Sequence, residues 1–454
     1  MKSLVWFRSD LRVRDNQALW NATRAKKEIV ALYIKSPKQW EVHDWSPAKT
    51  NFTLGCLKEL SSSLAAKGIR LYIEECPMFK QQPKLVAEFA KSNDCSNVFW
   101  NAEYEVNESA RDLRVTETLT KANIPFEESH DQVIVHPTRI LNGDGKPYTV
   151  FSAYQRAWFK VVGPQHLMPL NAPRSTGEVQ APRMETPDEV PNFPPGEEEA
   201  IRRLKSFIKD GAERYDKDRD RVDIDSTSKL SAYLAAGAIS NRTCIYAASR
   251  VDGRGAKKWM SELIWREFYR YVVYHFPRVC KHRSFRLETE HIRWHESDHD
   301  FKKWQDGLTG FPIVDAGMRQ LKAESFLPNR MRMIVAMFLV KDLLIDWRRG
   351  EKHFMRHLVD GDLASNNGGW QWCASTGNDA APYFRIMNPE LQSKKCDPHG
   401  DYIRRWVPEL ADIEGDAIHN PSSFDREACG YPQPIVDHSQ ARLRTIAAYK
   451  RALA

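Results

Sequence analysis

The stretch Leu4-Val-Trp-Phe-Arg-Ser-Asp-Leu-Arg12 begins with four apolar residues and then becomes polar at once. A short apolar run with polar boundaries is typical of a strand buried on both faces of a parallel sheet. Similar runs follow at residues 29–34, 70–74 and 98–101, and helical patterns separate them at residues 16–27, 50–67, 83–92 and 107–122. This βαβ series predicts an α/β domain with a parallel, Rossmann-like sheet over residues 1–130.

The loop after the first strand has charged side chains where many nucleotide-binding proteins have glycines. Arg8-Ser-Asp-Leu-Arg12 stands in place of the G-x-G-x-x-G pattern. In that pattern the glycines let the backbone approach a pyrophosphate closely. We therefore expect no dinucleotide bound in the usual Rossmann manner at this sheet.

The composition and the sequence pattern of the chain change twice after the predicted sheet. Residues 131–196 contain ten prolines, which break up long elements, and one helical pattern at residues 151–161. From residue 197 onward the patterns are mostly helical, for example at residues 257–275, 317–323 and 330–347. We expect an interdomain linker over 131–196 and a larger all-α domain over 197–454, which carries the chemistry.

The bulk composition narrows the possible partners and the cellular compartment. A formal charge of +7 suggests a polyanionic partner, although solubility alone would explain so small an excess. The eight cysteines include no C-x-x-C pair, so we expect neither a metal site nor a disulfide framework, and a reducing cytoplasm fits best. The longest apolar stretch is interrupted by Lys341 and Asp342, which argues against a membrane span.

The segment Asp360-Gly-Asp-Leu-Ala-Ser-Asn-Asn-Gly-Gly-Trp-Gln-Trp372 mixes carboxylates, amides, glycines and tryptophans. Such a mixture is unusual in a hydrophobic core, because each buried amide or carboxylate needs a hydrogen-bond partner. The segment therefore predicts the lining of a flat, polar, redox-capable ligand. A loop between helices with a Trp anchor is the alternative for the segment taken alone.

Three further segments carry chemistry. The hydroxyls of Thr227-Ser-Lys-Leu-Ser231 precede a helical pattern and predict a phosphate seat. A helix over residues 262–270 places Glu262, Trp265, Arg266 and Tyr269 on one face. In Asn329-Arg-Met-Arg-Met333 a second helix combines an amide, arginines and methionines, and arginine grips phosphate in a bidentate manner.

Together these motifs resemble those of the photolyase/cryptochrome family, and most closely the bacterial, folate-antenna photolyases that repair cyclobutane pyrimidine dimers. The resemblance runs from Leu4–Arg12 through Trp370-Gln-Trp-Cys-Ala-Ser-Thr-Gly377 to Tyr431-Pro-Gln-Pro-Ile-Val436. It implies light-driven electron transfer from reduced FAD to the dimer in UV-damaged DNA. It also implies a flipped-out dimer, and we expect a monomer that associates with no membrane.

The resemblance also implies a role for individual residues. FAD would contact Tyr215, Thr227, Ser228, Lys229, Leu230, Ser231, Trp259, Arg266, Arg332, Asp360, Gly361, Asp362 and Asn366. Many relatives have Arg at the position of Lys229, and the diphosphate needs only the cation. Glu262, Asn329, Met333 and Asn366 would be the catalytic residues, with Asn366 facing the reactive central nitrogen of the flavin.

The DNA contacts and the electron path are implied in the same way. DNA would meet Arg219, Glu262, Trp265, Arg266, Tyr269, Asn329, Arg330, Trp372, Arg385 and Gln392. Trp370, Trp347 and Trp294 match the tryptophan chain that refills a photoexcited, oxidised flavin, although each alone could be a core residue. Phe326 stands where relatives often have Trp, and we expect little consequence.

The α/β domain of these relatives holds an antenna pigment. The resemblance places methenyltetrahydrofolate at His43, Asn107, Glu108, Cys280 and Lys281. A deazaflavin is the alternative pigment, and His or Asn/Glu pairs are common in any loop.

Three other functions are alternatives to the repair of cyclobutane dimers. A cryptochrome-type blue-light photoreceptor would usually have a long tail after the flavin domain, and Asp or Cys at the position of Asn366. Repair of pyrimidine–pyrimidone adducts is associated with two histidines in place of Asn329 and Met333. A generic flavoprotein oxidoreductase would need a nicotinamide fingerprint. Repair of cyclobutane dimers is therefore the expected activity.

Overall fold

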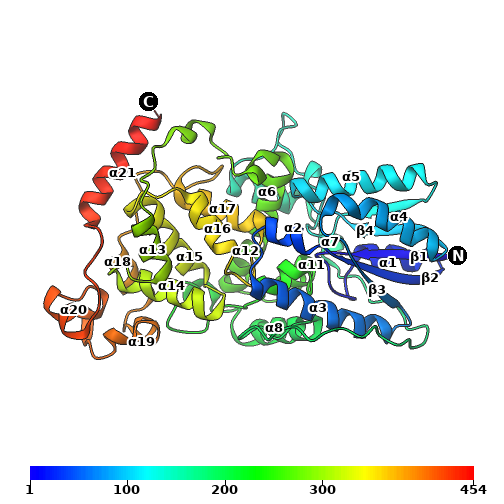
Figure 1. The fold of residues 1–454 in the computed structure, drawn as a ribbon, viewed down its shortest axis with the longest axis horizontal. Coiled ribbons are helices and arrows are strands. Elements are labelled where there is room, and N and C mark those ends of the chain that lie inside the picture. The colour runs from blue at the N-terminus through cyan, green and yellow to red at the C-terminus, as the bar shows by residue number, and fades with distance from the viewer. Residues whose placement is uncertain (454) are drawn as a thin grey trace. The chain divides into compact units, whose positions relative to one another are not determined.

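The computed structural model describes residues 1–453 (Figure 1). Two compact units interleave along this chain. The first unit comprises Met1–Glu213, Ser228–Cys280 and Val359–Ala364, and the second comprises Arg214–Thr227, Lys281–Leu358 and the chain from Ser365 onward. The division into residues 1–130, 131–196 and 197–454 stays a prediction.

The first unit contains the predicted parallel sheet. Its strands are β1 (Lys2–Phe7), β2 (Glu28–Lys35), β3 (Arg70–Glu75), β4 (Cys95–Asn101) and β5 (Phe126–Ser129), and all pair in parallel in the order β3-β2-β1-β4-β5. The central strand β1 aligns Leu4 with Val30 on one side and with Val98 on the other. Strand β5 was not predicted, because its sequence Phe-Glu-Glu-Ser is short, charged and mostly exposed.

Helices surround this sheet and continue into the part of the first unit that follows it. They are α1 (Gln17–Arg24), α2 (Pro37–Val42), α3 (Pro47–Ala65), α4 (Gln82–Ser92), α5 (Val106–Lys121), α6 (Phe151–Val161), α7 (Pro164–Leu167), α8 (Glu197–Asp210), α10 (Ser231–Ala236), α11 (Asn241–Ser249) and α12 (Arg254–His275), with short turns η1 (Phe79–Gln81), η2 (Pro137–Arg139) and η3 (Pro277–Lys281). Helix α4 packs against β4 and α5. The helix predicted at residues 151–161 is confirmed as α6.

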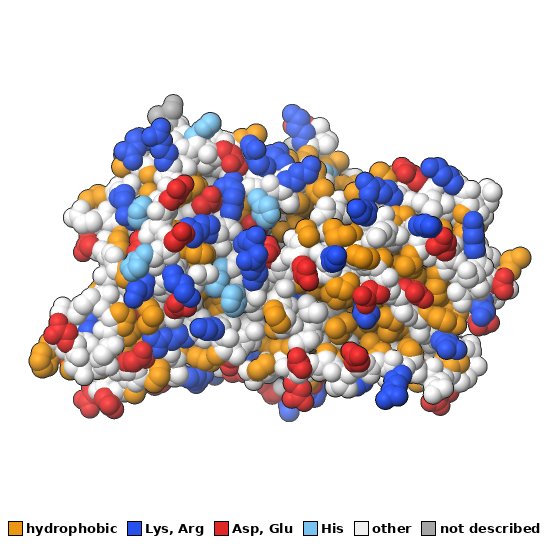
Figure 2. All heavy atoms as spheres, in the orientation of Figure 1, with side chains coloured by type: hydrophobic (Ala, Val, Ile, Leu, Met, Phe, Trp, Pro, Cys, Tyr) orange, Lys and Arg blue, Asp and Glu red, His pale blue; other side chains and the backbone are white. Residues whose placement is uncertain are grey.

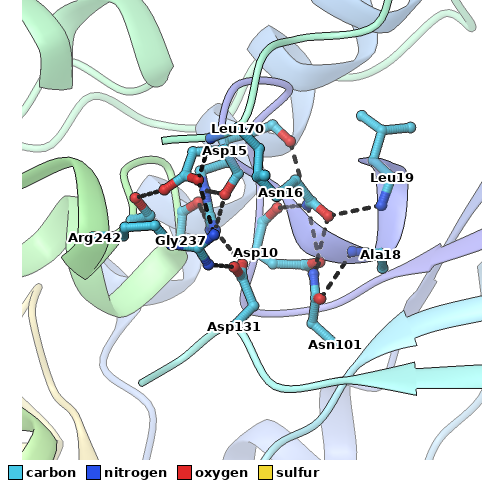
Figure 3. A network of polar contacts seen from close by, with 12 residues as sticks. Asp10, Asp15, Asn16, Ala18, Leu19, Asn101, Asp131, Leu170, Gly237 and Arg242 are labelled. Carbon is cyan, nitrogen blue, oxygen red and sulfur yellow. Dashed lines mark hydrogen bonds and ion pairs between the residues drawn. The ribbon is translucent and has the colours of Figure 1, made fainter. Parts of the chain in front are cut away.

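A buried polar network occupies the carboxyl end of β1 (Figure 3). Arg12 forms an ion pair with Asp131 and donates to the backbone oxygens of Asp15, at 2.7 Å, and Gly237, at 3.1 Å. Arg242 contacts Asp15 at 3.3 Å and Asp131 at 3.0 Å. We call Arg12, Asp15, Asp131 and Arg242 the edge network. Paired charges thus lie at the carboxyl ends of the strands, where nucleotide-binding α/β proteins bind phosphates.

The loop after β1 also supports helix α10. Gly237 caps this helix with a φ of 71°, and a Cβ atom there would lie 2.1 Å from the backbone oxygen of Ser9. The amide of Leu11 donates to the oxygen of Ala236 at 3.2 Å. Only glycine allows this close approach without strain, so the polar loop holds the end of α10 in place.

The second unit is helical. Its elements are α9 (Tyr215–Asp218), η4 (Leu287–His291), α13 (Asp298–Asp306), α14 (Pro312–Glu324), α15 (Asn329–Met337), the π-helical turn η5 (Phe338–Asp342), α16 (Trp347–Met355), α17 (Leu363–Ala374, which begins in the first unit), α18 (Pro389–Cys396), α19 (Asp401–Trp406), η6 (Pro408–Leu410), η7 (Gly415–His419), α20 (Ser423–Cys429) and α21 (His438–Leu453). Together with the sheet, these helices confirm the predicted fold class. In residues 1–453 no helix has the length and apolarity needed to cross a bilayer.

One predicted helix, over residues 330–347, is wrong in its second half. The α-helix ends at Met337 and passes into η5, after which Leu344 has a φ of 56°. Asp346 then caps α16 by accepting from the amide of Arg348 at 3.0 Å. The apolar pattern continued through this break, because every residue from Ile334 to Ile345 is buried.

Candidate functional site

Helix α12 carries five of the predicted site residues on successive turns. Trp259 is buried against Phe207 of α8, with ring centroids 4.8 Å apart. Glu262 is partly exposed and pairs with Lys258 one turn earlier, at 3.1 Å. The glutamate is thus held at the surface by a flexible partner, which a polar ligand could replace.

The indole of Trp265 is covered on one face. It stacks on Phe151 of α6 with centroids 3.8 Å apart and planes 11° apart, and Tyr269 lies tilted beside it at 5.5 Å. Stacking of this kind fixes the plane of an aromatic ring, so that its remaining face can receive another flat group.

Arg266 is a cation without a carboxylate partner among the ion pairs of residues 1–453. One of its N–H groups donates to the backbone oxygen of Leu234 in α10, at 2.7 Å. Burial and the charge of nearby Arg270 lower the pKa of Arg266 to about 9. The residues Ser228, Lys229, Leu230 and Ser231 lead directly into α10. A guanidinium with unused donors beside this turn fits the diphosphate of FAD.

The loop containing Asp360, Gly361 and Asp362 is tied to two helices of the first unit. Arg270 of α12 pairs with Asp362 at 2.5 Å, and Lys49 of α3 donates to the oxygen of Gly361 at 2.6 Å. Lys49 also lies over the ring of Trp45, 4.0 Å from its centre. Lys49 and Arg270 were not predicted as site residues, because each residue meets a partner that is distant in the chain.

Three of the predicted antenna residues form one cluster. His43 follows α2, and its Nε2 lies 2.9 Å from the amide nitrogens of both Gln39 and Asn107. Its Nδ1 lies 3.4 Å from Glu108 of α5. Cys280 lies in η3, and Lys281 ends that turn as the first residue of the second unit.

His43 and Glu108 lie within ion-pair distance, at 3.4 Å, but the directions of their pKa shifts favour the neutral form of both groups. Burial and the charge of Lys49 lower the pKa of His43 to about 4. Burial and the charges of Glu105 and Glu103 raise the pKa of Glu108 to about 8. Near neutral pH the cluster therefore offers an imidazole, a carboxyl group and an amide, which suit a heteroaromatic ring with both donors and acceptors.

In the second unit, α15 presents the Asn329 motif. The side-chain amide of Asn329 lies 3.6 Å from the sulfur of Met333, one turn away on the same face. Arg332 donates to the oxygen of Leu327 at 2.8 Å and lies over the ring of Phe326. Arg330 points to another partner, Asp220, at 2.5 Å.

Helix α17 carries Asn366, Trp370 and Trp372. The Asn366 side-chain nitrogen donates to the backbone oxygen of Glu351 at 3.0 Å, which directs the amide oxygen away from α16. The neighbouring Asn367 donates to the Glu351 carboxylate at 2.8 Å. Trp372 is partly buried and packs against the hydrophobic cluster that contains Trp370. The amide orientation of Asn366 is thus set by the helix packed behind it.

The three predicted electron carriers share one hydrophobic cluster. Trp347 and Trp370 are fully buried there, whereas Trp294 is partly exposed at its margin. Trp370 packs against Trp304 of α13 at 6.2 Å and Phe354 of α16 at 5.0 Å. We call Trp304, Trp347, Phe354 and Trp370 the aromatic core. The indole N–H groups of Trp347 and Trp370 have no hydrogen-bond partner among the described residues.

The remaining predicted contacts lie at or near the surface of the second unit. Tyr215 begins α9, Arg219 follows it, and Thr227 closes the same segment. Arg385 is exposed after α17, and Gln392 is partly exposed in α18. On the face drawn in Figure 2, Lys and Arg side chains alternate with Asp and Glu side chains rather than forming one continuous patch.

Comparisons with known proteins agree along the whole chain. A family model described as DNA photolyase matches residues 3–174, and one described as the FAD binding domain of DNA photolyase matches residues 259–451. A deoxyribodipyrimidine photo-lyase of Escherichia coli (strain K12) is 43% identical over 468 residues, covering 99% of this chain and 98% of the relative.

Solved structures show the same fold. A bacterial class III photolyase from Agrobacterium tumefaciens has a TM-score of 0.90 and 34% identity, covering 99% of this chain and 97% of its own. A Synechocystis sp. PCC6803 cryptochrome has a TM-score of 0.87 and 28% identity, covering 99% of both chains. With its sequence, its FAD-binding domain and its fold in agreement, the chain belongs to the photolyase/cryptochrome family and groups with the deoxyribodipyrimidine photo-lyases.

Proposed function

We propose that this chain splits cyclobutane pyrimidine dimers in UV-damaged DNA by light-driven electron transfer. The chain is an enzyme of the deoxyribodipyrimidine photo-lyase class and a flavoprotein that contains an FAD-binding domain. The observation that carries the proposal is the 43% identity to a deoxyribodipyrimidine photo-lyase across 99% of the chain. Bound, reduced FAD would supply the photoexcited electron, and the protein supplies position and charge.

The proposed FAD contacts are those that the family resemblance implies, and the position of Arg266 supports them. Arg266 and the turn at Ser228–Ser231 would hold the diphosphate, since Arg266 has no carboxylate partner among the described ion pairs. Tyr215, Thr227, Trp259, Arg332, Asp360, Gly361 and Asp362 would complete the contacts. Asn366 would offer its amide oxygen to the flavin, because its nitrogen is occupied by the backbone of Glu351.

The proposed contacts to the dimer come from helices α12, α15 and α17. Glu262 would exchange its exposed pair with Lys258 for a hydrogen bond to the dimer, which would stabilise negative charge on the substrate. Trp265 and Trp372 would stack on flipped-out bases, and Asn329 and Met333 would line the pocket. Arg219, Arg330, Arg385, Tyr269 and Gln392 would hold the DNA backbone or sugars, contacts that carry little sequence information.

Trp370, Trp347 and Trp294 would relay electrons to FAD when it has become oxidised. Their burial increases from Trp294, at the margin of the cluster, to the fully buried Trp347 and Trp370. A buried indole N–H without a partner costs stability, and a redox role is one reason to retain it.

The proposed antenna pigment is methenyltetrahydrofolate. The neutral cluster of His43, Asn107 and Glu108 supports a pterin-like ring with donors and acceptors. Cys280 and Lys281 would add further contacts. We also propose that the protein acts as a monomer in the cytoplasm.

A blue-light photoreceptor without repair activity is the second candidate. The likeness to the Synechocystis cryptochrome favours it, at 28% identity. Identity to the deoxyribodipyrimidine photo-lyase of Escherichia coli is higher, at 43%, which supports repair.

Repair of an oligonucleotide with one thymine dimer decides between the two functions. Reduced enzyme should restore normal thymines under blue light and leave the dimer intact in darkness. Glu262→Ala should lower repair more than it lowers damaged-DNA binding, because the carboxylate would act mainly on the charged dimer. Bound, photoreducible FAD without repair would favour the photoreceptor.

A further inference from the structure

Two of the proposed DNA-binding arginines share one carboxylate in the second unit. Asp220 Oδ2 accepts from Arg330 Nη2 at 2.5 Å, and Asp220 Oδ1 lies 3.5 Å from Arg219 Nε. The three residues come from the segment after α9 and from the start of α15. Their summed charge is therefore +1, where two arginines alone would give +2.

The segment that carries Asp220 is held firmly. Val222 is buried in the core of the second unit, and its amide donates to the oxygen of Cys396 at 2.9 Å. Ser226 donates to the oxygen of Asp218 at 2.7 Å. Asp220 is thus anchored close to a buried residue, and its position does not depend on the arginines alone.

The carboxylate remains charged and reachable. Burial raises the pKa of Asp220, but the hydrogen bond and charge of Arg330 and the charge of Arg219 outweigh burial and lower it. The Asp220 side chain is 32% exposed, and those of Arg219 and Arg330 are 14% and 16% exposed. The carboxylate is thus partly exposed, so a phosphate can reach the arginines and exchange with it.

We propose that Asp220 weakens binding of the DNA backbone by competing with phosphates for Arg219 and Arg330. The inference rests on the proposed function, since it takes both arginines as phosphate contacts. An enzyme that searches for rare lesions and must leave repaired DNA gains from such a competitor, because backbone contacts bind intact and damaged DNA alike. Asp220 would be a positioning residue that tunes affinity and takes no part in the chemistry.

The test compares Asp220→Asn with a matched variant, Glu409→Gln. Glu409 pairs with Arg319 at 2.7 and 2.9 Å, with exposed fractions of 32% and 19%, and neither residue is a proposed DNA contact. Both substitutions remove one negative charge and preserve shape. Any effect of overall charge is therefore common to both, and at 0.1 M salt it falls off over about 10 Å.

The measurement is binding of an undamaged duplex between 50 and 200 mM salt. Asp220→Asn should bind about three- to tenfold more tightly at 50 mM salt, with a salt slope steeper by about one, because one more arginine charge reaches phosphate. Glu409→Gln should change affinity less. Binding by Asp220→Asn that is no tighter than by Glu409→Gln, or weaker than wild type, would overturn the proposal.

Two further variants connect the effect to the pair itself. Asp220→Glu keeps the charge and should behave like wild type. In an Arg330→Ala background, Asp220→Asn should give much less gain, because the main arginine that the substitution releases for phosphate is then absent. An undiminished gain in the double variant would contradict the competition.

Failure of this proposal is separable from failure of the proposed function. If wild type repairs dimers but Asp220→Asn does not tighten binding, only the competition is wrong. If Asp220→Asn tightens binding but wild type repairs nothing in light, the competition stands and the repair function falls.

Discussion

The edge network of the first unit buries paired charges, whereas the aromatic core of the second unit buries two indole N–H groups that have no partner among the described residues. In the edge network, Arg12 and Arg242 each meet Asp131, and Asp15 receives Arg242 as well. In the aromatic core, the buried N–H groups of Trp347 and Trp370 have no partner within residues 1–453.

This difference predicts which substitutions should destabilise each region. Buried charges persist only when they are paired, so the edge network depends on every member. An unpaired indole N–H costs far less than an unpaired charge, and the packing around it can compensate. The first region should therefore be sensitive to loss of charge, and the second to changes of shape or of redox-active rings.

The largest effect should come from Arg12→Met. This change leaves Asp131 and the oxygens of Asp15 and Gly237 without their main donor, which should lower the free energy of unfolding by about 3–5 kcal/mol. Urea unfolding of the holoenzyme measures it. Arg14→Met is the control, because Arg14 is exposed: its pair with Glu198 and its longer contact with Glu197, at 3.8 Å, should together contribute about 1 kcal/mol at most. If both variants lose the same free energy of unfolding, the edge network is no more sensitive to loss of charge than the surface is.

The aromatic core should respond next to a change of volume. A Cβ atom on Gly350 would lie 2.1 Å from Trp370, so Gly350→Ala should destabilise the protein by about 1–3 kcal/mol. Gly143→Ala, where no heavy atom lies within 4 Å of the new Cβ, should leave unfolding unchanged. Thermal unfolding compares the two. A neutral Gly350→Ala would mean that the indole can shift freely.

Removal of a ring at the margin of the cluster tests its redox role. Trp294→Phe should slow photoreduction of oxidised FAD by at least about tenfold, or roughly 1.4 kcal/mol in rate terms, because phenylalanine is hard to oxidise. Repair by enzyme reduced beforehand should not change. Flavin absorbance under blue light measures photoreduction, and the yield of restored thymines measures repair. Photoreduction at the wild-type rate would exclude Trp294 from the path.

The smallest effect concerns a pair that joins α21 to η5. His438 lies 2.5 Å from Asp342, and this hydrogen bond raises the pKa of His438 above its usual 6.5 despite partial burial. The stabilisation is therefore complete below about pH 6.5 and is lost as the pH rises through the elevated pKa. Hydrogen exchange of α21 amides should be faster at pH 9 than at pH 6, after correction for intrinsic rates.

Burial of Asp342 acts in the same direction. It raises the pKa of this carboxyl although His438 and Arg444 lower it, so deprotonation at higher pH also costs stability. The total should stay near 1 kcal/mol, because the histidine is partly exposed. His438→Gln should remove the part of the pH dependence that comes from the histidine and leave the part that comes from Asp342. An undiminished dependence in this variant would assign the effect to other groups.

Much of the first unit could be predicted from local patterns. Four of the five strands and the helices α1, α3, α4 and α5 were predicted to within a few residues, because buried parallel strands are continuous apolar runs. The short helix α2 was not predicted. Strand β5 escaped because Glu127 and Glu128 make it polar. The predicted helix over 330–347 failed because a π-turn and a positive φ at Leu344 leave the apolar pattern unbroken.

The candidate site was predictable only where its residues share a motif. Trp265 and Tyr269 on α12, or Asn329 and Met333 on α15, are neighbours by helical spacing alone. Lys49 at Gly361 is different, because its partner lies 312 residues away and no local pattern marks the pair.

The sequence by itself determined four of the five strands, most of the helices of the first unit, the motifs that resemble the photolyase family, and the chemical character of each motif. Local spacing and composition suffice for these features. Only the tertiary structure decided which charges are neutralised: Asp131 for Arg12, Asp220 for Arg219 and Arg330, and no carboxylate among the described residues for Arg266. Charge pairing depends on distances of a few ångströms between segments far apart in the chain, and such distances exist only once the chain has folded.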